Sequence, residues 1–174
     1  MLTAKSISLS APALIGVLLF LFTTLNLQPL RAQELTNDQV DRGILVSCTH
    51  VAAQGLSAIL EGKEYKEQIE LCREFIKPIR FFDDQSGYFY IYDMKGVNIA
   101  HATQADKEGK DLFEYRDSKG NLLIQGLIKA AAEGGGFVDF WWENPLTKKE
   151  EQKLGYAEPI KGTDFFIGSG IYVK

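Results

Sequence analysis

Cysteine and histidine are both scarce in this sequence, with two of each among 174 residues. Cys48 and Cys72 are too few for a disulfide framework, and their spacing matches no zinc-ligand pattern. The sequence contains no CxxCH segment, which excludes covalent attachment of haem. With His50 and His101 as the two histidines, a histidine-based metal site is not expected either, so we predict no cofactor.

An excess of positive charge is also missing. Lysine and arginine number 19 against 23 acidic residues, which gives a formal net charge of −4. Non-specific binding of nucleic acid needs a basic face, so we expect no nucleic-acid partner. Hydrophobic residues make up 45% of the chain, with 11 Phe and 7 Tyr, and this favours a packed domain over disorder.

The apolar stretch near the N-terminus is short. Ala11–Leu25 has 15 residues, fewer than the roughly 20 that a membrane-spanning helix needs. It precedes Leu30-Arg31-Ala32, where Ala32 offers a cleavage point, so residues 1–32 are predicted to be a secretory signal peptide. An uncleaved N-terminal anchor is the alternative, because Leu30 is larger than the residue usual at that position. Residues 33–174 then form one domain that is periplasmic or secreted, or tethered to the cytoplasmic membrane.

Two consecutive helices are predicted after this leader. Residues 36–60 carry apolar side chains at helical spacing, and one of residues 36–38 can cap the first turn. A second apolar stripe at spacings of four and three follows in residues 65–79. In an antiparallel hairpin Cys48 and Cys72 are offset by about one helical turn, which leaves both a disulfide and two buried free thiols open.

Two strands joined by a tight turn are predicted between Gly87 and Ala102. Alternate side chains of a strand point to opposite faces, so one face of the first strand carries Tyr88, Tyr90 and Tyr92. Phe89 and Ile91 occupy its other face, and Gly96 is free to adopt a positive φ in the turn. The second strand is predicted to place three side chains on one face: Val97, Ile99 and His101.

The rest of the chain continues this mixed pattern. Residues 104–119 indicate a loop, and residues 121–133 a helix that ends at three consecutive glycines. Three further strands are expected at 137–142, 153–159 and 165–173, joined by short turns that make them antiparallel neighbours. We therefore predict an α+β fold, a five-stranded antiparallel sheet with the helices on one side.

Six segments in this order resemble the single-Cache domain, the PAS-like extracellular sensor module of bacterial chemoreceptors and histidine kinases. They are Gly87–Asp93 with Gly96, Ile99–His101, Glu108–Leu112, Gly136–Pro145, Lys153–Tyr156 and Phe165–Tyr172. The resemblance covers about residues 40–174 and implies a long N-terminal helical hairpin plus a five-stranded antiparallel PAS-like sheet. Ala102 departs from the family, which usually has proline there. Family members are typically one module of a larger receptor, so this chain, which stops at Lys174, is expected to have no signalling domain of its own.

The resemblance implies a pocket between the sheet and the loop and helix after the second strand, for small organic anions such as short carboxylates, or for amino-acid-like molecules. Tyrosine, histidine and lysine can donate to a carboxylate, and tryptophan can close an apolar wall. Lys153 and Tyr156 are an odd number of positions apart, so a regular strand points them to opposite faces unless a bulge intervenes. The candidate ligand-binding residues are Tyr88, Tyr90, His101, Trp142, Lys153 and Tyr156.

These residues support an extracytoplasmic small-molecule sensor domain, with a membrane-bound receptor, kinase or transporter as the expected partner. Each side chain also has an ordinary explanation as half-buried sheet surface, core or solvated charge. A periplasmic interaction or scaffold protein with a degenerate pocket is therefore the alternative. An enzyme is not expected, because the sequence shows no nucleophile–base pairing and no metal-ligand cluster.

Overall fold

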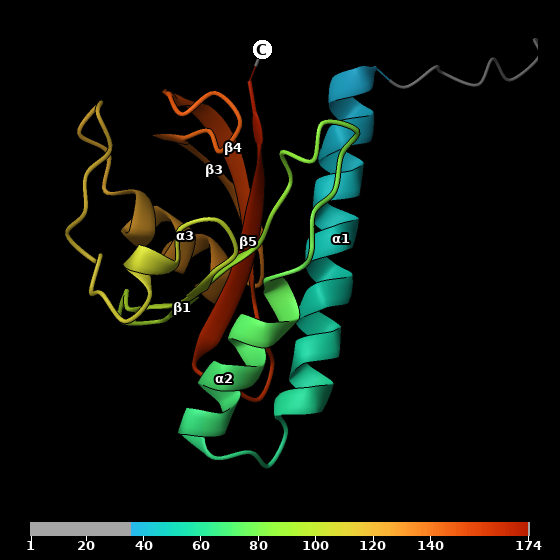
Figure 1. Cartoon of the computed structure of the whole chain (residues 1–174), viewed down its shortest axis with the longest axis vertical. Coiled ribbons are helices and arrows are strands. Elements are labelled where there is room, and N and C mark those ends of the chain that lie inside the picture. The colour runs from blue at the N-terminus through green and yellow to red at the C-terminus, as the bar shows by residue number, and fades with distance from the viewer. Residues whose placement is uncertain (1–35, 174) are drawn as a thin grey trace, which may run out of the picture. The chain divides into compact units, whose positions relative to one another are not determined.

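A computed structural model describes residues 36–173 of the chain, and the expected leader lies outside this range. Helices and strands follow one another in an αα-ββ-α-βββ order, with one short 3₁₀ turn (Figure 1). The elements are α1 (Asn37–Leu60), α2 (Tyr65–Ile76), β1 (Tyr90–Asp93), β2 (Asn98–His101), η1 (Ala105–Lys107), α3 (Leu123–Ala132), β3 (Gly136–Glu143), β4 (Glu150–Pro159) and β5 (Phe165–Tyr172).

The five strands form one antiparallel sheet, as predicted. Their order is β2-β1-β5-β4-β3, so the C-terminal strand lies at the centre between the first hairpin and the second. Consecutive strands β3, β4 and β5 pair through short turns, and β5 then returns to pair with β1. The predicted α+β fold is confirmed.

Helices cover both faces of the sheet, which corrects the prediction that they lie on one side. α1 and α2 pack on one face, against Phe89 and Ile91 of the first hairpin (Figure 1). α3 packs on the opposite face, where Leu123 and Leu127 meet the three tyrosines of the same strand. The predicted alternation of that strand is thus confirmed, and its two faces belong to two separate cores.

The first hairpin contains an irregularity that the sequence pattern missed. Gly96 adopts the expected positive φ of 96° in the turn. Tyr90 lies opposite His101, but Tyr92 lies opposite Asn98, so one extra residue is accommodated in β2. This bulge turns Ile99 toward the α1 and α2 core, whereas His101 faces α3. The prediction that Ile99 and His101 share a face is wrong for this reason.

Both cysteines are free thiols. Cys72 is fully buried in the core beneath α1 and α2, and Cys48 packs against the same cluster. Burial raises the pKa of the Cys72 thiol to about 12, so this group stays protonated at neutral pH.

The first helix has two different sides. Leu45, Ala52 and Leu56 are buried against the sheet. α1 is long and apolar enough to cross a membrane, but core helices of soluble proteins can be equally long and apolar. Away from the sheet it exposes four large apolar side chains, which we call the α1 stripe: Val40, Ile44, Val51 and Ile59.

Candidate functional site

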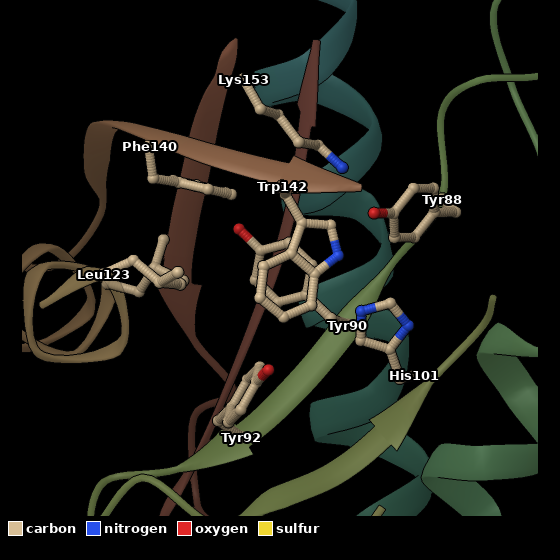
Figure 2. A pocket seen from close by; sticks show the side chains of 9 residues that line it. Tyr88, Tyr90, Tyr92, His101, Leu123, Phe140, Trp142 and Lys153 are labelled. Atoms are coloured by element: carbon tan, nitrogen blue, oxygen red, sulfur yellow. The ribbon is translucent and has the colours of Figure 1, made fainter. Parts of the chain in front are cut away.

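A small cavity lies between the sheet and α3. It has a volume of about 10 Å³, which is room for about one water molecule. Figure 2 shows side chains from β1, β2, β3, β4 and α3 converging on it. Its lining consists of Tyr88, Tyr90, Tyr92, His101, Leu123, Leu127, Phe140, Trp142 and Lys153. The structure therefore brings together five of the six predicted site residues.

Glycines in β4 and β5 let large side chains lie flat on the sheet here. A Cβ on Gly168 would stand 2.4 Å from the Tyr90 ring, and a Cβ on Gly155 would stand 2.5 Å from the Phe140 ring. A Cβ on Gly170 would stand 2.6 Å from Cε of Lys153. These distances are shorter than non-bonded carbon atoms tolerate, so the floor of the cavity requires residues without side chains.

Lys153 is the one cationic residue in the lining, and it is fully buried. Its Nζ lies 3.8 Å from the centre of the Tyr88 ring and 4.6 Å from that of Tyr172. Among residues 36–173 this Nζ has no hydrogen-bond partner. Burial lowers the pKa of Lys153 well below its usual range, because an unpaired ammonium is poorly stabilised away from water. Within the described part of the chain, the amino group therefore has no hydrogen-bonding counterpart.

His101 presents a proton donor to the same cavity. Its Nδ1 accepts the backbone N–H of Gln104 at 3.1 Å, so in the neutral ring the proton sits on Nε2. Burial lowers the pKa of His101 to about 3, with a further contribution from the nearby positive charge of Lys153. The ring stacks on Trp142 at 6.0 Å and on Tyr90 at 6.2 Å between centroids.

The tyrosines stay neutral. Burial raises the pKa of Tyr88 to about 12 and that of Tyr90 well above its usual value. The Tyr90 hydroxyl donates to the backbone oxygen of Ser169 at 3.3 Å, near the long limit for such a bond. No carboxylate belongs to the lining, so the cavity combines one cationic group with neutral donors and apolar walls.

Tyr156 does not reach this cavity. β4 pairs with β5 in an unbroken register from Lys153 to Pro159, so Lys153 and Tyr156 point to opposite faces. The Tyr156 hydroxyl donates to Glu158 at 3.2 Å, on the side where Glu158 meets His50 of α1 at 3.0 Å. Placing Tyr156 with the other five was an error, and the odd spacing had already indicated it.

Sequence reasoning also missed residues that the fold brings to the site. Tyr92 continues the tyrosine row and could have been included from the alternation alone. Tyr172 was not predictable in this way, because it reaches Lys153 only through the pairing of β4 with β5. Within the described range, no cluster of three metal-ligating side chains occurs.

Comparison with known protein families gives a match over most of the chain. The profile of the family described as "Cache domain" matches residues 45–174. The sensor histidine kinase MctS of Rhizobium johnstonii is 32% identical over 89 residues, which is 51% of this chain and 19% of the kinase. The match therefore spans about a fifth of the length of that relative.

Solved structures with the same fold are also sensor domains. A methyl-accepting chemotaxis protein from Vibrio parahaemolyticus superposes with a TM-score of 0.70 and 31% identity, covering 78% of this chain and 90% of that one. A second solved structure, described as the structural basis for carboxylic acid recognition by a Cache chemosensory domain, superposes with a TM-score of 0.65 and 24% identity. This match covers 80% of this chain and all of that domain. It shows that the two chains share a fold.

Proposed function

The chain belongs to the Cache domain family, and on that basis we propose that residues 33–174 bind a small organic anion, in particular a short carboxylate, in the cavity beneath α3. Cache domains are extracellular or periplasmic sensors of chemotaxis proteins and histidine kinases. The role proposed for this chain is accordingly recognition of a small molecule, not catalysis.

The observation that carries the proposal is the unpaired amino group of Lys153. A buried polar group without a partner costs about 1 to 3 kcal/mol, and more when it is charged. A carboxylate beside Nζ would supply both charge and hydrogen-bond acceptors. The lining holds no carboxylate of its own, so it offers no negative charge to the ammonium group of an amino acid. This favours a simple carboxylate over the amino-acid-like ligands that the family resemblance also allowed.

Four of the lining residues then receive a role. We assign the ion pair to Lys153 and a hydrogen bond from Nε2–H to His101. We assign a hydrogen bond to the anion also to Tyr90, whose hydroxyl proton would turn to it from Ser169. Trp142 supplies the apolar wall. The cavity of about 10 Å³ is too small for a carboxylic acid, so binding requires α3 or Trp142 to move outward.

A thermal-shift screen tests this function. A ligand that binds only the folded state adds about 2.7 kcal/mol at a hundredfold excess over Kd. For a domain of this size that raises the melting temperature by about 10 °C. The panel contains C2 to C6 carboxylic acids, amino acids and amines. The simple carboxylic acids should raise the melting temperature in this way, and the amino acids and amines should not.

Lys153→Met should abolish the shift, because it removes the charge while keeping a side chain of similar length. Lys149→Met is the matched control, since Lys149 is exposed on the loop between β3 and β4. A full panel without any shift in the wild-type protein would refute the carboxylate function. A shift that survives Lys153→Met would refute the assigned role of Lys153.

The wider setting is also a proposal. We infer that residues 1–32 are a signal peptide or an anchor, and that a membrane-bound receptor, kinase or transporter receives the signal. The α1 stripe of Val40, Ile44, Val51 and Ile59 supports a partner, because several large apolar side chains exposed on one helix favour contact with another surface. The same stripe favours the alternative of a scaffold protein, and the ligand screen separates the two.

A further inference from the structure

The hydroxyl of Tyr172 takes part in two hydrogen bonds whose direction can be worked out. Its Oη lies 2.8 Å from the backbone oxygen of Glu143, and a carbonyl oxygen can only accept, so Tyr172 donates its single proton there. The Oη of Tyr88 lies 3.2 Å from the Oη of Tyr172. Because the proton of Tyr172 is already committed, the proton in this second bond comes from Tyr88.

This direction changes the role of Tyr88 in the cavity. Figure 2 shows the hydroxyl oxygen of Tyr88 directed toward Lys153 and Trp142. The oxygen faces the site, but its proton points to Tyr172, so Tyr88 offers lone pairs and no donor to an anion. The donors that remain are the amino group of Lys153, Nε2–H of His101 and the weakly bonded hydroxyl of Tyr90.

We propose that Tyr172 is a positioning residue that decides which groups of the site donate to the anion. By accepting the proton of Tyr88 it withdraws Tyr88 from the donor set. It also locks the Tyr88 ring, whose centre lies 3.8 Å from Nζ, against Lys153. Tyr172 is placed for this by register, since it lies directly opposite Lys153 across β4 and β5. The inference rests on the proposed carboxylate function.

Loss of the Tyr172 hydroxyl should turn Tyr88 into a donor. In a Tyr172→Phe protein the ring beside Lys153 is kept, but the acceptor for the Tyr88 proton is gone. Thr103 also places a hydroxyl beside Tyr88. In the wild-type protein the Tyr172 hydroxyl is a strengthened acceptor, because it donates its own proton to Glu143. In Tyr172→Phe the charged carboxylate competes for the Tyr88 proton against the Thr103 hydroxyl alone. The proton of Tyr88 should therefore turn to the carboxylate.

A double-mutant cycle measured with propionate tests this inference. In the wild-type background, Tyr88→Phe should change the Kd for propionate less than threefold. In the Tyr172→Phe background, the same substitution should weaken binding roughly tenfold, since a hydrogen bond to a charged group is lost. Tyr156→Phe is the matched control, because it removes a hydroxyl on the opposite face of the sheet, and it should leave the Kd unchanged in both backgrounds.

Two results would overturn the inference. One is a tenfold loss from Tyr88→Phe in the wild-type background, which would mean that Tyr88 already donates to the anion. The other is the absence of any loss in both backgrounds. If Tyr172 only packed against the sheet, the effect of Tyr88→Phe on the Kd would be the same in both backgrounds. It would also not differ from the effect of Tyr156→Phe.

The same four proteins also give a test without ligand. If the two hydroxyls are bonded to each other, the double variant should lower the midpoint of urea unfolding less than the two single variants lower it together. Strictly additive midpoints would overturn the inference even if no carboxylate binds. Failure of the whole acid panel on wild-type protein would instead refute the proposed function, so the two failures are distinguishable.

Discussion

Lys153 shows how one residue can serve binding at the expense of stability. Its amino group is fully buried against aromatic rings and has no hydrogen-bond partner among residues 36–173. Replacing such a group by an apolar side chain of similar length removes the cost of burying it.

We therefore expect Lys153→Met to stabilise the ligand-free domain by about 1 to 3 kcal/mol, measured by urea unfolding. Lys149→Met should leave the unfolding free energy within about 0.5 kcal/mol of wild type. A loss of stability in Lys153→Met would mean that the amino group has a stabilising partner after all.

His101 makes the domain sensitive to acid. Burial lowers its pKa to about 3 in the folded protein, against the usual 6.5 when unfolded. The unfolded chain therefore binds more protons between these values, so stability falls as the pH falls through this window. From this residue alone, the free energy of unfolding should drop by about 2 kcal/mol between pH 7 and pH 5. Unfolding curves of His101→Gln should show a weaker pH dependence than wild type, and identical dependence would contradict the assignment.

At the scale of the element, the central strand β5 is shaped by its glycines. A Cβ on Gly170 would stand 2.6 Å from Cε of Lys153 and 2.8 Å from the backbone oxygen of Leu154. Its φ is not positive, so close approach alone explains the need for glycine.

Gly170→Ala should destabilise the domain by about 1 to 3 kcal/mol, as expected for an overpacked core, and should weaken carboxylate binding by displacing Lys153. Gly43→Ala is the matched control, because a Cβ there meets nothing within 4 Å. In α1 this change should stabilise the protein by about 0.5 to 1 kcal/mol, since alanine favours helix more than glycine does. Calorimetry on both variants checks the opposite signs, and equal signs would contradict the packing argument.

At the scale of the whole molecule, we propose that residues 1–32 act as a leader that places the sensor domain outside the cytoplasm, where it meets its ligand. We expect fractionation of bacteria expressing the full chain to find the domain outside the cytoplasm. Mass spectrometry should give residues 33–174 if the leader is cleaved after Ala32, or the full chain in the membrane fraction if it is an anchor. Replacing Leu18 and Leu19 by arginine interrupts the apolar stretch and should retain the protein in the cytoplasm. Wild-type protein found mainly in the cytoplasm would contradict the proposed localisation.

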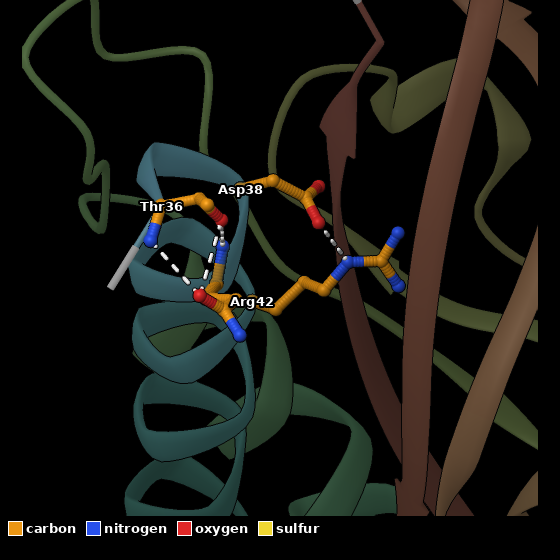
Figure 3. A network of polar contacts seen from close by, with 4 residues as sticks. Thr36, Asp38 and Arg42 are labelled. Carbon is orange, nitrogen blue, oxygen red and sulfur yellow. Dashed lines mark hydrogen bonds and ion pairs between the residues drawn. The ribbon is translucent and has the colours of Figure 1, made fainter. Parts of the chain in front are cut away.

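Features that depend on neighbours along the chain were determined by the sequence alone. Figure 3 shows the start of α1, where Thr36 and Gln39 each accept a backbone N–H from the other, at 3.2 and 2.9 Å. Arg42 pairs with Asp38 one turn earlier at 2.8 Å. Such contacts span three or four residues, so spacing is enough to predict them. The alternation of the tyrosine row in β1 was predictable for the same reason.

Features that depend on which strands pair were decided only by the tertiary structure. The bulge in β2 separated Ile99 from His101, and the unbroken register of β4 turned Tyr156 away from the site. Tyr172 reached Lys153 only because β5 pairs with β4. In a sheet, a shift of one residue moves a side chain to the other face. The sequence therefore predicted which types of side chain the candidate site contains. Strand register and the packing of α3 determined which of these side chains face one another.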